Sequence, residues 1–241
     1  MKSGIQLYTL REESKKDFIA VLEFVAKCGF DTVEFAGYYG LTAEEIKAEL
    51  DRLGLGCAGT HTGYAEVLEQ PRETIAFHKT IGCDYVIIPW YTMEKAEDAI
   101  ALAERINAVS SLYAENGITL GYHNHGHEFK KDGEKYLIEI LAEHAPALQL
   151  ELDTYWSTDA GVDTCGFMQT YRDRIRLIHL KDGNKEGLQA IGDGDMDIQA
   201  VLDAAKEIGL DCFVVENDDP RPDGFTNVAR CMDQLKERYS F

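Results

Sequence analysis

The amino-acid sequence predicts an α/β protein, a single (β/α)8 barrel that spans residues 1–241. Three observations support this prediction: eight short β-rich runs, amphipathic segments between them, and a repeat of roughly 30 residues, which suits one strand plus one helix. Alternating strands and helices joined by short turns imply an all-parallel sheet. Eight such units fit a closed barrel better than an open, doubly wound sheet, which usually has about five or six strands.

The predicted strands are short runs rich in β-branched, aromatic and other apolar residues. In chain order they are Ile5–Leu10, Thr32–Phe35, Gly56–Thr60, Tyr85–Pro89, Ile118–Tyr122, Leu148–Leu152, Ile175–Leu180 and Cys212–Glu216. No linker or low-complexity segment separates them, so we expect one domain.

The predicted helices have apolar residues at helical spacing. They cover approximately Phe18–Ala26, Ala43–Leu53, Pro71–Ile81, Lys95–Asn116, Tyr136–His144, Gly166–Arg172, Ile198–Ile208 and Thr226–Tyr239. Several end at a glycine, such as Gly29 and Gly82, which suits a left-handed helix cap. The longest irregular stretch, Asp182–Asp197, follows the seventh strand, where a loop of this length is usually functional.

Composition and charge argue against several classes of protein. The net charge of −19 repels nucleic-acid phosphates. The sequence contains no window of about 18 uninterrupted apolar residues, so no membrane span is indicated. The first residues lack a signal-peptide pattern, and we therefore expect a cytoplasmic protein. The six cysteines are isolated and form no CxxC pair, which indicates small buried side chains rather than a zinc or redox motif.

Polar residues gather where the predicted strands end, the place that carries the chemistry of such barrels. Five of the seven histidines lie there: His61, His123, His125, His127 and His179. Side chains alternate along a strand between the barrel interior and the helix layer. One inward residue from each of the last four strands gives the predicted metal ligands His123, Asp153, His179 and Glu216. Two imidazoles and two carboxylates suit Mn²⁺, Zn²⁺, Fe²⁺ or Co²⁺, and Mg²⁺ less well.

These residues resemble the xylose isomerase-like barrel superfamily, which includes sugar phosphate isomerases/epimerases and inosose dehydratases. The resemblance spans nearly the whole chain and rests on Gly4–Arg11, Val33–Phe35, Tyr122–His125, Leu152–Trp156, His179–Asp182, Ile191–Gly194 and Val215–Glu216. It implies a divalent metal held by Glu, Asp, His and Glu, of which Asp153, His179 and Glu216 match the last three. The first ligand departs, because His123 stands where many members have glutamate; Glu128 is its nearest competitor.

The resemblance implies an enzyme of carbohydrate metabolism, a metal-dependent sugar isomerase or epimerase that removes a proton next to a carbonyl, with manganese as the first candidate ion stabilising the enediolate. Glu216 would be ligand and base. His125 or Lys181 would supply the second acid/base, with Glu151 and Glu128 as alternatives. A dehydratase or lyase acting on a keto-sugar or inosose is the alternative, because His123 removes one of the two family glutamates. A phosphodiesterase is opposed by the net charge of −19, and a non-catalytic sugar-binding barrel would hold no metal.

The expected partner is a small sugar or cyclitol, with no nucleic acid and no membrane, and a homo-oligomer is left open. Tyr8, Trp90 and Trp156 would stack on the apolar face of the sugar, although ordinary rim packing explains the tryptophans equally well. Glu34 and His61 are predicted to bind substrate hydroxyls, with a structural hydrogen bond as the alternative, and Glu128 is a further predicted substrate-binding residue. No Arg/Lys cluster follows a predicted strand beyond Lys181, which favours a substrate without phosphate.

Overall fold

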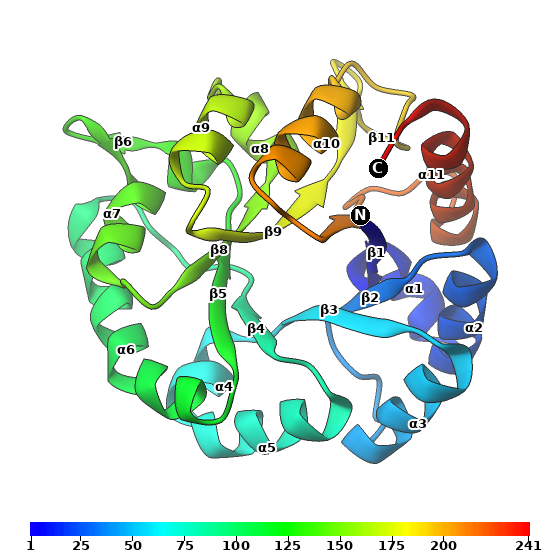
Figure 1. Cartoon of the computed structure of the whole chain (residues 1–241), viewed down its shortest axis with the longest axis horizontal. Helices are drawn as coiled ribbons and strands as arrows, with labels where there is room; N and C mark the ends of the chain where they lie inside the picture. The colour runs from blue at the N-terminus through cyan, green and yellow to red at the C-terminus, as the bar shows by residue number, and fades with distance from the viewer.

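Eight parallel strands close into a barrel in the order β1-β12-β9-β8-β5-β4-β3-β2, and helices surround it (Figure 1). The computed structural model describes residues 1–241. The barrel strands are β1 (Lys2–Gln6), β2 (Thr32–Phe35), β3 (Gly56–His61), β4 (Tyr85–Ile88), β5 (Thr119–His123), β8 (Gln149–Asp153), β9 (Ile175–Leu180) and β12 (Cys212–Val215). The predicted (β/α)8 barrel is confirmed.

The main helices pack their apolar faces against the barrel. They are α2 (Phe18–Cys28), α3 (Ala43–Leu53), α5 (Pro71–Ile81), α6 (Ala96–Glu115), α7 (Leu137–His144), α9 (Thr164–Thr170), α10 (Ile198–Glu207) and α11 (Gly224–Arg238). Gly29 and Gly82 cap α2 and α5 in the left-handed conformation, as the sequence predicted. No helix is long and apolar enough to cross a membrane.

The first strand is shifted from its predicted position. We expected Ile5–Leu10, but β1 ends at Gln6 and Leu7–Leu10 forms the 3₁₀ helix η1. The Gln6 side chain causes the turn, because its Oε1 accepts the Tyr8 N–H at 3.0 Å. Several short elements were not predicted from the sequence. They are α1 (Arg11–Ser14), α4 (Tyr64–Glu69), α8 (Thr154–Asp159), η2 (His127–Phe129) and the hairpin formed by β6 (Lys131–Asp132) and β7 (Lys135–Tyr136).

The lower end of the barrel interior, where the strands begin, is filled by a small apolar cluster. It consists of Tyr85, Ile87, Leu177 and Val214. The Tyr85 ring needs the glycine on the neighbouring strand, since a Cβ at Gly121 would lie 2.6 Å from its ring atoms. These side chains are buried and fill the lower part of the barrel interior.

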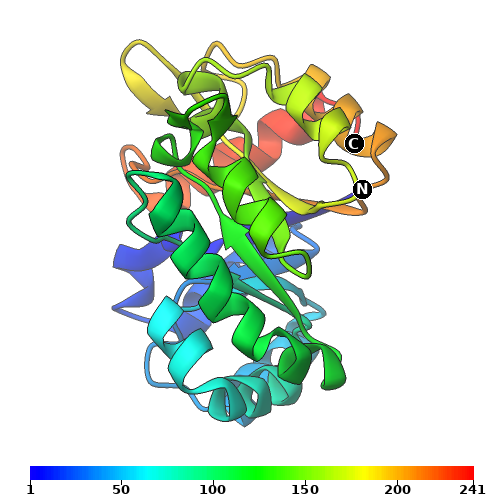
Figure 2. The same ribbon diagram turned by 90° about the vertical axis from the view of Figure 1, so that its left-hand side faces the viewer.

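The irregular stretch after β9 contains a hairpin, β10 (Asp182–Asn184) and β11 (Gly187–Gln189), which projects beyond the barrel (yellow in Figure 2). The buried Asp182 carboxylate holds this loop by accepting four backbone N–H groups, from Gly183, Gly192, Gly194 and Met196. One side chain thus fixes both ends of the loop beside the upper opening of the barrel.

Candidate metal centre

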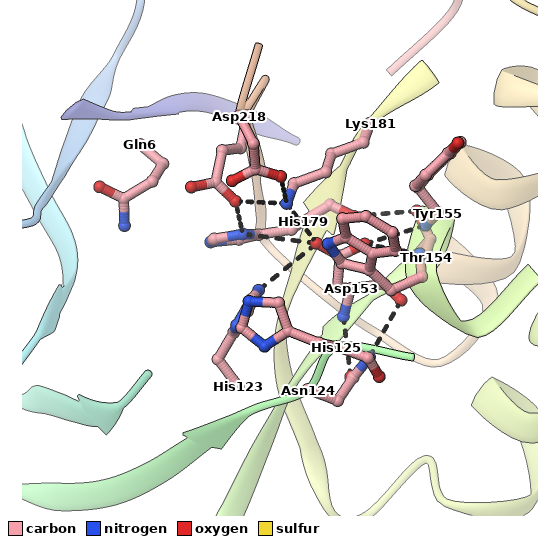
Figure 3. Close-up of polar contacts among 12 residues, drawn as sticks. Gln6, His123, Asn124, His125, Asp153, Thr154, Tyr155, His179, Lys181 and Asp218 are labelled. Atoms are coloured by element: carbon pink, nitrogen blue, oxygen red, sulfur yellow. Dashed lines mark hydrogen bonds and ion pairs between the residues drawn. The ribbon is translucent and has the colours of Figure 1, made fainter. Parts of the chain in front are cut away.

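Four donor groups meet at the upper end of the barrel, and we call them the outer group: His123, Asp153, His179 and Glu216. Their ligand atoms all lie within 4.8 Å of one another. The His123 Nε2 to Asp153 Oδ2 distance is 3.4 Å, and His179 Nδ1 lies 2.9 Å from Glu216 Oε2. The structure therefore brings together the four residues that strand parity selected (Figure 3 labels three of them).

The outer group suits a divalent ion. His123 Nε2 is buried and has no hydrogen-bond partner, an arrangement that costs free energy unless something is bound there. Asp153 keeps one oxygen for the backbone, since Oδ1 accepts the N–H groups of Tyr155 and Trp156 at the start of α8. The helix start thus orients Oδ2 towards His123.

Lys181 places a fixed positive charge beside the outer group (Figure 3). Its Nζ lies 2.9 Å from Asp153 Oδ2 and 2.7 Å from both Glu216 Oε2 and Asp218 Oδ2. Burial alone would lower the pKa of Lys181, but the three carboxylates outweigh it and raise the pKa well above its ordinary value. Lys181 is therefore charged and offsets part of the buried negative charge.

The same charges keep the outer carboxylates ionised. Burial alone would raise both pKa values, but the Lys181 charge lowers them most and the histidines lower them further. The pKa of Asp153 falls to about 2, and that of Glu216 lies well below its ordinary value. Both side chains are therefore available as anionic ligands at neutral pH.

One layer deeper lies a second set, which we call the inner group: Glu34, His61, Glu151 and the Nε2 atom of His179. Glu34 Oε2 is 2.6 Å from His179 Nε2, and Glu151 Oε2 is 2.7 Å from His61 Nε2. Burial, with the nearby Glu151 charge second, raises the pKa of Glu34 to about 7. Burial would also raise the pKa of Glu151, but the two histidines hold it well below its ordinary value.

A pocket of about 430 Å³ opens above the outer group. Of the predicted residues, it is lined by Tyr8, His61, Trp90, His123, His125 and Glu216. Tyr8 and Trp90 are the most exposed, at 43% and 51%, so the two aromatic rings stand at the rim. Tyr8 already carries the Arg11 guanidinium, 4.3 Å from its ring centroid.

Other predicted residues lie outside the pocket lining. Glu34 and Glu128 are wholly buried, and Glu128 accepts the Tyr122 O–H and the His125 N–H, which fixes the turn after β5. Glu128 is also absent from the outer group, whose fourth donor is His123. Lys181 is likewise buried beneath the surface, and Trp156 lies 5.6 Å from its Nζ.

Sequence reasoning missed two functional groups, Gln6 and Asp218. Gln6 Nε2 donates to Glu34 Oε2 at 2.7 Å, and Asp218 both lines the pocket and contacts Lys181. Asp218 shares a strand face with Glu216, so alternation could have identified it. Gln6 was hidden because it was expected near the start of a strand from Ile5 to Leu10, whereas it ends β1.

The fold and the outer group together define a barrel with a candidate metal centre at the strand C-terminal ends. The model of the xylose isomerase-like TIM barrel family matches residues 22–235. The chain therefore belongs to this family, as the motifs indicated, and is a member of an enzyme superfamily.

The chain is also similar to individual known proteins. An inosose dehydratase from Geobacillus kaustophilus is 22% identical over 209 residues, covering 76% of this chain and 67% of the relative. The crystal structure of a sugar phosphate isomerase/epimerase from Parabacteroides distasonis superposes with a TM-score of 0.85 at 25% identity, covering 98% and 94% of the two chains. The IOLI protein, whose structure has a bound zinc atom, superposes with a TM-score of 0.73 at 18% identity. The match covers 98% of this chain and 96% of the IOLI chain.

Proposed function

We propose that the chain is a divalent-metal-dependent sugar isomerase or epimerase, with Mn²⁺ as the first candidate ion. The observation that carries the proposal is the outer group, four buried nitrogen and oxygen donors within 4.8 Å of one another beneath an open pocket. A divalent ion there would supply positive charge that stabilises the enediolate formed when a proton leaves the carbon next to the carbonyl.

Glu216 is the proposed base. It reaches the pocket surface, and its Oε2 contacts His179 and Lys181 at 2.9 and 2.7 Å, which fixes its orientation. Because its pKa lies well below the ordinary value, it is ionised and ready to accept a proton at neutral pH. As an isomerase base, Glu216 would take a proton from one carbon and return it to the next on the same face.

His125 is the proposed partner that moves the hydroxyl proton. It lines the pocket beside His123, with ring centroids 4.9 Å apart. Burial, with His123 and Lys181 second, lowers its pKa to about 3. The ring is therefore neutral at neutral pH, and it would pass a hydroxyl proton on rather than hold it as an imidazolium. Lys181 instead acts through its charge, because it is wholly buried and bound by three carboxylates.

The proposed substrate is a small sugar or cyclitol without phosphate. The pocket lining includes the acidic Glu216 and Asp218 and no lysine or arginine. The nearest guanidinium, Arg11, is occupied by the backbone oxygens of Tyr8 and Asp218. Tyr8 and Trp90 at the rim are placed to cover an apolar sugar face, while His61 offers a hydroxyl contact from the pocket wall.

A dehydratase of keto-sugars or inososes is the second candidate. It is favoured by His123, which replaces the first glutamate of the family pattern and leaves Glu216 as the sole carboxylate base of that pair. The likeness to an inosose dehydratase supports it as well. Both reactions begin with the same proton abstraction, so the outer group serves either.

The test is incubation of the chelator-treated and Mn²⁺-reloaded protein with ketoses and inososes in D₂O, followed by NMR. An isomerase or epimerase gives rearranged product with solvent exchange at the carbon, and a dehydratase gives a product that has lost water. We expect the first outcome, and only with metal restored. Turnover that persists unchanged in chelator, or a metal-loaded protein inactive on every sugar and inosose, would count against the proposal.

A further inference from the structure

A second cavity opens at the lower end of the barrel, where β8, β9 and β12 begin, and we call it the lower cavity. Its volume of about 520 Å³ exceeds that of the pocket above the outer group, which is about 430 Å³. It is lined by Tyr85 and Leu177 of the interior apolar cluster and by the turn Ile208–Asp211, which joins α10 to β12. Its volume lies within the usual range of about 300–1,000 Å³ for small-molecule sites.

A β-bulge brings a charged side chain to this mainly apolar cavity. The β8–β9 register shifts between Leu150 and Glu151, where Arg176 is the extra residue of β9, and a bulge re-aims the side chain that it contains. The Arg176 guanidinium reaches past β8 and β5 to the Tyr85 ring of β4, 4.9 Å from the ring centroid. Arg176 is therefore a wall residue of the lower cavity.

The Arg176 guanidinium has hydrogen-bonding capacity that the protein leaves unused. Nη1 donates to Thr119 Oγ1 and Nη2 donates to Asp84 Oδ1, both at 2.8 Å. A guanidinium has five N–H donors, so three remain for the oxygen atoms of a ligand. Asp84 already balances the positive charge, which leaves donors without a net charge to be neutralised.

The charges of the lining favour an uncharged ligand. Arg176 and Asp211 are its only charged residues, one of each sign. A carboxylate would have to compete with Asp84 for the guanidinium and would be repelled by the net charge of −19, whereas a cation would meet Arg176. A mainly apolar lining with a few polar groups is the usual composition of a small-molecule site.

We propose that the lower cavity is a ligand site separate from the candidate metal centre, for an uncharged, mainly apolar molecule that presents an oxygen to the Arg176 guanidinium. Tyr85 divides the two sites. A Cβ at Gly59 would lie 2.8 Å from Glu34 Oε1 and 3.5 Å from Tyr85 Cδ1, so the inner group and the Tyr85 ring meet at this glycine. A ligand in the lower cavity would contact Tyr85 without touching a metal ligand. The proposal does not depend on the reaction proposed above.

The experiment is titration of the full chain with benzyl alcohol, followed by ligand-observed NMR, with a crystal soak to locate the molecule. We expect saturable binding with the same affinity in chelator-treated and Mn²⁺-reloaded protein. The soak should show the ring in the lower cavity and the hydroxyl at Arg176. Benzoate and benzylamine, which carry a charge on the same ring, should both bind more weakly.

Two variants test the recognition. Arg176→Leu removes the donors and should weaken benzyl alcohol binding at least about tenfold, the usual effect of losing a hydrogen bond to a charged group. Ala58→Leu adds bulk at the lining, against the apolar cluster, and should weaken binding while the guanidinium stays in place. Arg72→Leu, at an exposed arginine of α5, is the matched control and should keep the wild-type affinity.

The possible results separate this inference from the proposed function, whose test measures turnover of sugars. Benzyl alcohol found only outside the lower cavity overturns the proposal, as does binding at crystal concentration only. Tighter binding of benzoate overturns the uncharged class, and binding that is lost with the metal contradicts two separate sites. Because the wild-type titration and map decide these points, a variant that fails to fold cannot obscure them.

Discussion

The two ends of the barrel interior are built from opposite chemistry. At the lower end, Tyr85, Ile87, Leu177 and Val214 form an apolar cluster, and the one charged group against it is the Arg176 guanidinium, 4.9 Å from the centroid of the Tyr85 ring. At the upper end, the outer and inner groups bury four carboxylates within the same ring of strands. The lower end removes apolar surface from water and stabilises the fold, whereas the upper end places charges where burial opposes them.

The comparison indicates that the lower end stabilises the folded barrel, whereas the burial of charges at the upper end lowers its stability. Lys181 and His179 offset part of the upper charge, but Glu34 Oε1 is buried without a hydrogen-bond partner. Substitutions at the upper end should therefore affect metal binding and chemistry more than folding. Substitutions at the lower end should do the reverse.

The largest expected effect is that of Asp153→Asn on activity. The amide oxygen can still accept the Tyr155 and Trp156 N–H groups at the start of α8, so the change is confined to the Oδ2 position, where an uncharged NH₂ replaces the anionic ligand atom. We expect turnover to fall by at least about 100-fold, because transition-state charge loses its stabilisation. Steady-state kinetics with saturating Mn²⁺ measures this, with Asp159→Asn, at the exposed end of α8, as control.

The same variant should remain folded. In chelator at neutral pH its free energy of unfolding is expected to fall by about 2 kcal/mol, because the lowered pKa of Asp153 means that Lys181 and the histidines stabilise the ionised carboxylate more than burial destabilises it. If Asp153→Asn instead unfolds the protein while its activity per folded molecule is unchanged, the assignment of the upper end to chemistry is wrong.

Leu177→Ala at the lower end should lower the free energy of unfolding by about 2–5 kcal/mol, the usual cost of a cavity in a packed core. Leu177 is 3% exposed, so little of the lost contact can be replaced by water. Urea unfolding measures the loss, with Ile19→Ala on the exposed side of α2 as control. Metal content should be unchanged, and a Leu177→Ala protein that loses its metal would show that the two ends are coupled.

The smallest expected effect is acid destabilisation through Asp153 in the chelator-treated protein. Its pKa is about 2 in the folded chain against an ordinary value of 3.8. The unfolded chain thus binds the proton first, and stability is present above pH 3.8 and lost as the pH falls towards 2. The contribution is on the order of 2 kcal/mol. Urea unfolding across this range should show a shallower acid decline for Asp153→Asn, and equal slopes would contradict the pKa assignment.

Much of the fold could be predicted from the sequence, because helix and strand formation depend on interactions between residues close together in the chain. The boundaries of β2, β9, α3 and α5 match the predicted residues, since apolar periodicity, proline and cap glycines define them within a few residues. Alternation along each strand likewise selected the outer group. The pattern could not reveal α8, because it begins directly after Asp153 with no intervening turn residue.

The inner group lay beyond sequence reasoning because it depends on distant pairing. Glu34 was expected to bind substrate hydroxyls, but it contacts His179, 145 positions further along the chain. Which side chains meet across a closed barrel depends on strand tilt and stagger, and the β2–β3 register even shifts at Val33/Glu34. Alternation shows that a residue points inward, but not which residue it faces.

The Asp182 anchor has a consequence for how this protein could diverge. The Asp182 carboxylate follows β9 directly and accepts hydrogen bonds from Gly192, Gly194 and Met196. The tip of the β10–β11 hairpin therefore makes no contribution to this anchor. Insertions or exchanges at Lys185–Glu186 would leave both attachment points intact. The hairpin is thus a segment whose length and sequence can change without disturbing the candidate metal centre.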